Sequence, residues 1–221
     1  MTKKLKIQDL NSVWFMSDPH YGHKNLCRGV SNWTDTMLRT RDFNTLDEMN
    51  EAIVRNINTD VKEDDHLFCL GDWSFGGINS ILEFRKQINC KRIYLVLGNH
   101  DHHVEKNKIL PNGDYKTVTV KAKEAFTWVG HYLEVKINDE NFVLCHYPMV
   151  SWNNLSRQSI MLHGHEHLKG DARFVSGGKQ MDVGFDGSPE FRPYSLREIL
   201  TIMEERPVKT LLTYTHHEIN R

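Results

Sequence analysis

Short apolar runs that end in potential metal ligands are the feature of this sequence that most restricts its fold. Each run is too short for a typical helix, so we interpret it as a buried strand. The runs are Val13–Met16, Leu67–Leu70, Ile93–Leu97, Phe142–Cys145 and Ile160–Leu162. Aspartate, asparagine or histidine follows every one of them within a few residues. The pattern predicts several strands that carry polar side chains to one place.

The clearest of these stretches runs from Ile93 to Asp101 and reads Ile-Tyr-Leu-Val-Leu-Gly-Asn-His-Asp. Its glycine allows a sharp turn at the end of the strand. Asn99, His100 and Asp101 then offer an amide oxygen, an imidazole and a carboxylate, which suit a site that cleaves phosphate esters with metal ions. Alone, the tetrapeptide Gly98–Asp101 is a moderate signal. The same arrangement of an apolar strand followed by metal ligands occurs elsewhere in the chain, which strengthens it.

Two helices are expected between the first three strands. Thr45 and Glu48 form a capping-box pattern, and apolar residues recur at helical spacing from Leu46 to about Ile57. A second helical pattern covers residues 78–88. A strand, helix, strand order predicts parallel pairing of the strands.

The second half of the chain shows alternating apolar residues and turn signals, which favour antiparallel strands. Pro111–Asp114 predicts a turn, alternation follows at Val118 and Val120, and it returns at residues 133–137. Further short strands are expected at 173–176, 181–185 and 210–214, with a helical turn at 195–200. We therefore predict an α/β fold in which two β-sheets pack face to face with helices on the outer sides, in a single domain over residues 1–221.

Charge and cysteine content limit the possible partners and compartment. Lys plus Arg is 28 and Asp plus Glu is 29, so the net charge of -1 gives no attraction to long duplex nucleic acid or to a membrane. No apolar run has the length of a signal or membrane-spanning segment. The four cysteines lack CxxC spacing, which favours buried reduced thiols. We expect a cytoplasmic protein.

The candidate ligands all follow the carboxyl ends of predicted strands, where loops of an α/β sheet converge on one crevice. They are Asp18, His20, Asp72, Asn99, His146, His165 and His167. Nitrogen and oxygen ligands without cysteine exclude a structural zinc-thiolate site, and seven ligands exceed the needs of one tetrahedral ion. Two ions bridged by a carboxylate would lie ~3.5–4 Å apart, as in two-metal phosphoester hydrolysis.

At this point the motifs resemble those of the calcineurin-like metallophosphoesterases, and they occur in that family's order. The matching motifs are Asp18-x-His20, Gly71-Asp72, Gly98-Asn99-His100-Asp101, His146 and Gly164-His165-Glu166-His167. Together with the short length, the surrounding residues resemble a compact bacterial or phage branch. The resemblance implies a four-layer αββα sandwich. Pro19 and Glu166 depart from the usual motifs, and Glu166 weakens substrate analogies.

Carried over by position, the resemblance implies a role for each motif residue. Asp18, His20 and His167 hold one divalent ion; Asn99, His146 and His165 hold the other; Asp72 bridges both. A hydroxide that bridges the metals attacks phosphorus. His100 protonates the leaving group as general acid, and Asp101 orients His100. Manganese is the first expectation for the metal, and Fe, Zn, Co or Ni also suit these ligands.

The predicted function is therefore hydrolysis of phosphoesters, with phosphodiesters of nucleotides or small nucleic acids as the expected substrates. The near alternative is a phosphomonoesterase that acts on nucleotides, sugar phosphates or phosphoproteins. An alternative of another class is a scaffold that keeps this fold without catalysis. The presence of His100 together with every ligand argues against the scaffold.

Substrate contacts are less constrained by the sequence. His23 lies close to the first motif, and Arg28 and Arg41 could clamp a phosphate, although surface arginines are common. Trp73 and Trp152 follow site loops and could stack on a nucleobase. For both tryptophans, packing in the core is the favoured interpretation.

Overall fold

The protein is described by a computed structural model that covers residues 3–5, 7, 9–33, 39–109, 115–119, 121–175 and 178–209. The predicted turn at Pro111–Asp114, the residue Val120 and the predicted strand at 210–214 lie outside these residues. None of the helices described there combines the length and the apolar character needed to cross a membrane.

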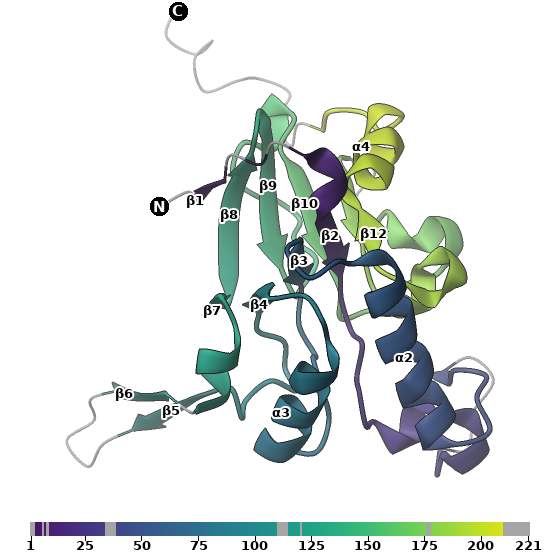
Figure 1. Cartoon of the computed structure of the whole chain (residues 1–221). Coiled ribbons are helices and arrows are strands. Elements are labelled where there is room, and N and C mark those ends of the chain that lie inside the picture. Colours follow the sequence, from purple (N-terminus) through teal and green to yellow (C-terminus); the bar gives the residue numbers. More distant parts are fainter. Residues whose placement is uncertain are drawn as a thin grey trace, which may run out of the picture.

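The first sheet contains the first three predicted strands and has the order β12-β2-β3-β4-β7 (Figure 1). Its strands are β2 (Val13–Met16), β3 (His66–Cys69), β4 (Arg92–Val96), β7 (Trp128–Gly130) and β12 (Tyr194–Ser195). The strands from β2 to β7 pair in parallel, and β12 runs antiparallel to β2. The predicted parallel arrangement of the first three strands is confirmed.

Two α-helices cover the outer face of this sheet. They are α2 (Leu46–Asp60) and α3 (Ile78–Gln87). The capping box at Thr45 and Glu48 is present, and α2 continues one turn beyond its predicted end. Met49, Ile53 and Ile57 of α2, like Ile81 and Phe84 of α3, are buried in one cluster with side chains of β3 and β4. Burial of these apolar faces holds the helices on the sheet.

The second sheet is mixed, with the order β1-β8-β9-β10-β11. Its strands are β1 (Lys3–Leu5), β8 (Tyr132–Ile137), β9 (Glu140–Cys145), β10 (Ile160–His163) and β11 (Gln180–Asp182). The expectation of an antiparallel half is confirmed for the β8–β9 hairpin and for the separate hairpin of β5 (Glu105–Ile109) and β6 (Tyr115–Thr119), which contains Val118. It is wrong for the rest of this sheet, because β1 pairs in parallel with β8, and β10 with both β9 and β11. The carboxyl ends of β9 and β10 consequently lie at the same edge.

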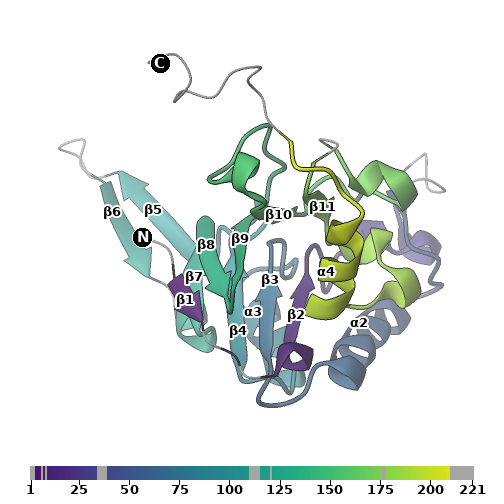
Figure 2. The ribbon, with the colours of Figure 1, turned by 90° about the horizontal axis from the view of Figure 1, so that it is seen from above.

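The two sheets face each other across an apolar core. Phe15 stacks on Phe68 within the first sheet at 5.2 Å and meets Phe142 of the second sheet at 5.4 Å, measured between ring centroids. Helix α4 (Leu196–Glu204) closes one side of this core, and Figure 2 shows it beside β2. The outer face of the second sheet is covered by a loop that contains Trp152 and Leu155. The predicted α/β fold with two packed sheets is confirmed.

Shorter elements connect these layers. The hairpin of β5 (Glu105–Ile109) and β6 (Tyr115–Thr119) projects from the body (Figure 1). The 3-10 helices are η1 (Leu10–Ser12), η2 (Lys24–Leu26), η3 (Arg28–Val30), η4 (Lys121–Ala125), η5 (Leu155–Arg157), η6 (Gly170–Arg173), η7 (Phe185–Gly187) and η8 (Pro189–Phe191). The strand predicted from residue 173 is wrong, since η6 ends there, and β11 is shorter than the predicted 181–185 strand. All four cysteines are free and buried, as predicted.

Candidate metal centre

Loops from both sheets meet at the carboxyl ends of β2, β3, β4, β9 and β10. Backbone hydrogen bonds join these loops: Asp18 N–H donates to Gly71 O, and His20 N–H to Asp72 O, each at 3.0 Å. Gly164 N–H donates to His146 O at 2.9 Å, which joins the two loops of the second sheet. The predicted convergence of the five motifs therefore occurs in the structure.

Five of the seven predicted ligands have a left-handed backbone conformation. Their φ angles are 52° for Asp18, 51° for His20, 54° for Asp72, 73° for His165 and 52° for His167. This region is unfavourable for residues other than glycine and is held only where surrounding structure enforces it. Its concentration at these positions indicates a functional site.

Glycines in two motifs allow the loops to approach closely. Gly71 has a φ of 103°, and a Cβ atom there would collide with the ring of His146. A Cβ on Gly164 would collide with Ser17 and with the Asp18 carboxylate. The glycine before each ligand is therefore required because the ligand of another loop occupies the space of its side chain.

Asp18, His20 and His167 form the first group of ligand atoms. His20 Nε2 lies 3.7 Å from Asp18 Oδ1 and 3.2 Å from His167 Nε2, and His167 Nε2 lies 3.8 Å from Asp18 Oδ1. Asp18 and His20 are buried, and Asp18 Oδ1 has no hydrogen-bond partner among the described residues. A buried carboxylate oxygen without a donor is costly, and a cation between these atoms would satisfy it.

Asn99, His146 and His165 form the second group. Asn99 Oδ1 lies 3.0 Å from His146 Nε2 and 3.0 Å from His165 Nδ1. His146 Nδ1 lies 2.8 Å from the carbonyl oxygen of Leu70, so this nitrogen donates and Nε2 is left with its lone pair. The second group thus presents an oxygen and two nitrogens.

Asp72 lies between the two groups. Its Oδ2 is 3.5 Å from His20 Nε2 of the first group and 3.7 Å from His146 Nε2 of the second. Its Oδ1 accepts a hydrogen bond from His100 N–H at 2.9 Å, which fixes the carboxylate. This is the position expected of a carboxylate that bridges two ions.

The donor atoms fit divalent cations. Atoms bound to one cation at about 2.0–2.2 Å lie roughly 3–3.5 Å from each other, and the separations within the groups are 3.0–3.8 Å. Burial lowers the pKa of His20 well below its usual value, so its ring is neutral and can coordinate. Burial raises the pKa of Asp18, a cost that a bound cation would offset.

Arg41 supports the ligands instead of facing substrate, which corrects the expectation that it binds phosphate. Its guanidinium is buried and donates to Asp18 O and Pro19 O, each at 2.7 Å. It also donates to both carboxylate oxygens of Asp186, at 3.1 and 2.9 Å. Asp186 Oδ2 in turn lies 2.7 Å from His167 Nδ1. Arg41 and Asp186 therefore fix the backbone of Asp18 and the ring of His167.

Asp186 was missed by the sequence analysis. Burial opposes ionisation of Asp186, but the Arg41 charge and the hydrogen bonds from His167 and Arg41 hold its pKa far below the usual value. It is therefore an anion that accepts from His167 Nδ1 and leaves Nε2 for a cation. The sequence did hold a signal for Asp186, because it follows apolar residues after β11 in the same way that the candidate ligands follow their strands.

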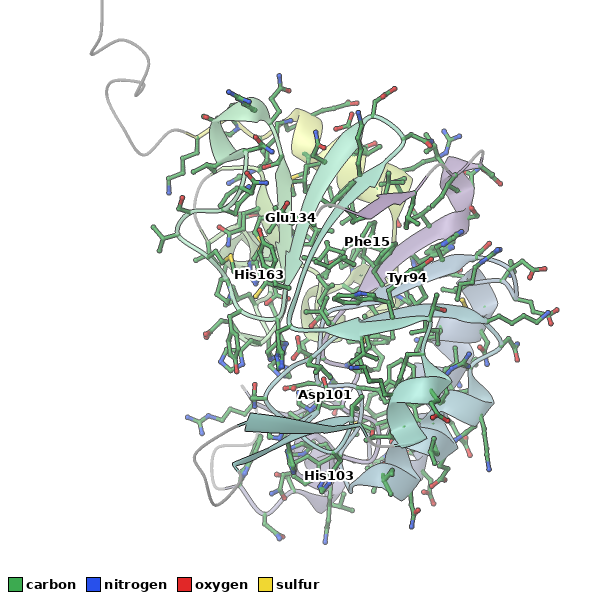
Figure 3. The ribbon with its side chains drawn as sticks, turned by 90° about the vertical axis from the view of Figure 1, so that its left-hand side faces the viewer. Phe15, Tyr94, Asp101, His103, Glu134 and His163 are labelled. Carbon is green, nitrogen blue, oxygen red and sulfur yellow. The ribbon has the colours of Figure 1, made fainter. Side chains whose placement is uncertain are left out.

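Asp101 has a different role from the one expected. Its carboxylate accepts hydrogen bonds from the backbone N–H groups of Asp72 at 2.8 Å, Trp73 at 3.0 Å and Gly98 at 2.8 Å. Figure 3 labels Asp101 below Phe15 and Tyr94 of the core. Burial raises its pKa to about 6, although these donors oppose the shift. Asp101 thus ties the β3 loop to the β4 loop, in place of the predicted bond to His100.

His100 and His23 border the centre, whereas the Arg28 guanidinium is paired with an exposed aspartate. His100 Nε2 lies 4.0 Å from Asp72 Oδ2, and its side chain is 36% exposed. The His23 ring packs 5.3 Å from His20 and 6.1 Å from His100, measured between centroids. Arg28 donates to Asp42 Oδ1 at 2.6 Å. The expectation that Arg28 clamps a phosphate has no support in these contacts.

A cavity of about 330 Å³ opens beside His167. Its lining residues are Leu26, Trp33, Arg39, Glu166, His167, Lys169 and Asp186. This volume is in the range of small-molecule sites. A larger hollow of about 730 Å³ lies away from the centre, between α2 and α3, and Asp47, Glu51 and Glu83 in its lining would repel a phosphate.

Comparisons with known proteins give independent evidence on the family and the fold. A model described as the calcineurin-like phosphoesterase superfamily domain matches residues 13–181. An uncharacterized protein of Methanocaldococcus jannaschii is 24% identical over 204 residues, which are 90% of this chain and 95% of that protein. The gene 66 protein of Mycobacterium phage D29 is 25% identical over 217 residues, which are 89% of this chain and 99% of that protein. A crystal structure of a protein of unknown function from Aquifex aeolicus has the same fold, with a TM-score of 0.58, 20% identity, and coverage of 86% of this chain and 98% of that one.

Proposed function

Because this chain belongs to the calcineurin-like phosphoesterase superfamily, we propose that it is a metal-dependent phosphodiesterase that acts on nucleotides or short nucleic acids. The observation that carries the proposal is the position of Asp72 Oδ2, within 3.5 Å of His20 Nε2 and 3.7 Å of His146 Nε2. One carboxylate oxygen shared by two ligand groups is what a two-metal site requires.

Each ligand group would hold one divalent cation. Asp18, His20 and His167 would bind the first, Asn99, His146 and His165 the second, and Asp72 both. When bound, such cations supply positive charge against the phosphate oxygens and make water a stronger nucleophile. Manganese is the first candidate, because these carboxylate, amide and imidazole donors suit it.

His100 is the proposed general acid. Its Nε2 lies 4.0 Å from Asp72 Oδ2, and its backbone N–H donates to the same carboxylate. The partly exposed ring can reach the leaving oxygen of a bound phosphoester and return to solvent contact for reprotonation. A diester needs such an acid because an alkoxide leaves poorly without a proton.

Two of the three arginines between positions 28 and 41 are not free to bind a phosphomonoester, which supports a diester as the substrate. A phosphomonoester carries a second negative charge, which proteins commonly bind with a bidentate arginine. Arg41 is committed to Asp186 and to backbone carbonyls, and Arg28 to Asp42, whereas Arg39 lines the cavity beside His167. The net charge of -1 argues against long duplexes.

The test compares purified protein, stripped of metal and then supplied with Mn²⁺, on bis(p-nitrophenyl) phosphate and p-nitrophenyl phosphate. We expect faster hydrolysis of the diester, followed by activity in a screen of cyclic and linear nucleotides and oligonucleotides. Asp72→Asn should abolish turnover, and Asp139→Asn, at a fully exposed position in the turn after β8, is the matched control. Hydrolysis of the monoester alone would identify a phosphatase, and no hydrolysis with any divalent metal would contradict the proposal.

A further inference from the structure

Two exposed aromatic rings stand beside the metal centre. Phe75, three residues after Asp72, is 42% exposed, and Tyr147, directly after His146, is 46% exposed. Among the described residues, Tyr132 is the third large aromatic side chain with this degree of exposure, at 40%. Scattered exposed apolar side chains need no explanation, but here two of three exposed rings touch histidines of one site.

Phe75 packs against His23 and His100, the two histidines that border the centre. Its ring centroid lies 4.2 Å from that of His23 and 5.4 Å from that of His100. Its backbone N–H donates to Tyr21 O at 2.8 Å, which fixes the residue beside the loop of the first ligands. Phe75 therefore presents a positioned apolar face next to the proposed general acid.

Tyr147 packs against histidines of the second ligand group. Its ring centroid lies 4.9 Å from that of His146 and 4.7 Å from that of His165. His146 and His100 both lie near Asp72 Oδ2, at 3.7 and 4.0 Å. The two aromatic rings thus border the same carboxylate through different histidines.

The tryptophans considered for stacking do not compete for this role. Trp73 is buried and packs 4.3 Å from Phe84, and Trp152 is buried and donates to Ser159 O. The predicted core packing of both is confirmed. Phe75 and Tyr147 are the exposed rings at the centre, whereas Trp33, which lines the cavity beside His167, is half-buried.

We propose that Phe75 and Tyr147 stack on planar groups at the two ester positions of the substrate. The inference rests on the proposed function and specifies its substrate class: phosphodiesters with an aromatic or nucleoside group on each side, such as dinucleotides and short single strands. Phe75 takes the leaving group, because it adjoins His100, which protonates that group. Tyr147 takes the retained group. Aromatic stacking suits any base, since every base has a π-face.

The test uses two diesters that share a p-nitrophenyl leaving group and differ in the retained group: bis(p-nitrophenyl) phosphate and methyl p-nitrophenyl phosphate. Phe75→Leu should raise KM for both by ~10-fold, the size of one stacking contact. Tyr147→Leu should reduce the preference for the bis-aryl diester over the methyl diester by ~10-fold. Thymidylyl-thymidine, followed by chromatography, should report losses in both variants.

Controls separate stacking from other causes. Tyr132→Leu removes the third exposed ring and controls for general effects. Phe75→Tyr and Tyr147→Phe should restore wild-type KM, because they keep a stacking face. A fall in kcat without a change in KM would mean that Phe75 only positions His100, and would overturn the proposal for that residue.

The outcome also separates this inference from the proposed function. If the wild-type enzyme hydrolyses diesters but both leucine variants behave like Tyr132→Leu, the stacking proposal is wrong and the phosphodiesterase remains. If the wild-type protein hydrolyses no phosphoester with any divalent metal, the proposed function is wrong and the stacking inference falls with it.

Discussion

Buried charges around the centre act on the ligands through other atoms. Both carboxylate oxygens of Asp101 accept hydrogen bonds, from three backbone N–H groups in all. The Arg41 guanidinium donates to two backbone carbonyls and to Asp186. Such contacts fix the ligand atoms before a cation arrives, which reduces the reorganisation needed on binding. Substitutions at these residues should therefore alter metal affinity even though none of them is a proposed ligand.

Replacing Asp186 with asparagine should weaken metal binding. The variant removes the charge that faces His167 Nδ1 and Arg41 at 2.7 and 2.9 Å. We expect the affinity for Mn²⁺ to fall ~10–100-fold, as for other carboxylates that orient a histidine ligand. Titration calorimetry on metal-free protein measures this, and Asp171→Asn, at an exposed position, is the control. Equal affinities for wild type and Asp186→Asn would show that the contact does not orient His167.

Replacing His100 with asparagine should separate catalysis from metal binding. Because His100 is the proposed acid and not a ligand, kcat should fall ~10²–10⁴-fold while the Mn²⁺ content, measured by elemental analysis, stays unchanged. His102→Asn, at an exposed neighbour, controls for changes in the loop. The loss should be smaller for esters with a good leaving group such as p-nitrophenol. A wild-type rate on every substrate would remove His100 from the mechanism.

The sequence predicts which residues are candidate metal ligands better than it predicts which residues hold those ligands in position. The candidate ligands could be identified because each motif follows the end of a strand, and in three of the five motifs a glycine precedes the donor. Arg41 and Asp101 were assigned wrongly because a sequence does not tell which way a side chain points. Arg41 turns inward toward Asp186, 145 residues further along the chain, and only the folded chain brings the two together.

At the scale of elements, continuous apolar runs were more informative than alternation. The parallel strands β2, β3 and β4 are buried on both faces, between the helices and the second sheet, so their sequences are apolar except for the first residues of β3 and β4, His66 and Arg92. In the second sheet, the alternation of β8 correctly indicated a hairpin with β9. The parallel pairing of β10 with its neighbours depends on the course of residues 146–159, a tertiary feature that no local pattern encodes.

Helix α4 offers a stability test away from the centre. Burial opposes the charge of Glu198, but bonds from Arg192 and Ser195 lower its pKa to about 2. Because the pKa of Glu198 is lower in the folded chain, its ionised carboxylate stabilises the fold at pH values above about 4.5, the pKa in the unfolded chain. This stabilisation is lost as the pH falls toward 2. Glu198 is 38% exposed, so solvent screening limits the gain to about 1 kcal/mol.

Thermal unfolding of Glu198→Gln should show this dependence. The variant should melt below wild type at pH 7, and the difference should narrow as pH falls below about 4.5. Glu204→Gln, at the other end of α4, controls for the loss of one negative charge. A difference that stays constant down to pH 3 would mean that the Glu198 carboxylate does not contribute through its charge.

At the scale of the whole molecule, the centre joins the two sheets. The first sheet contributes Asp18, His20, Asp72 and Asn99, and the second contributes His146, His165 and His167. A bound cation in either group would link the sheets at one edge of their shared core. Metal binding should therefore stabilise the folded chain as a unit, because an unfolded chain does not hold the two sets of ligands together.

Metal removal should lower the thermal stability of the wild-type protein. At a Mn²⁺ concentration 100 times the Kd, one site adds about 2.7 kcal/mol, which raises the unfolding temperature by roughly 5–10 °C for a chain of this size. Calorimetry of metal-free protein with and without Mn²⁺ measures the shift. Asp72→Asn should reduce it most, because Asp72 faces both ligand groups, whereas Asp42→Asn should keep it. With 13 histidines in the chain, metal could bind elsewhere, so an undiminished shift in Asp72→Asn would locate the stabilising ions outside this centre.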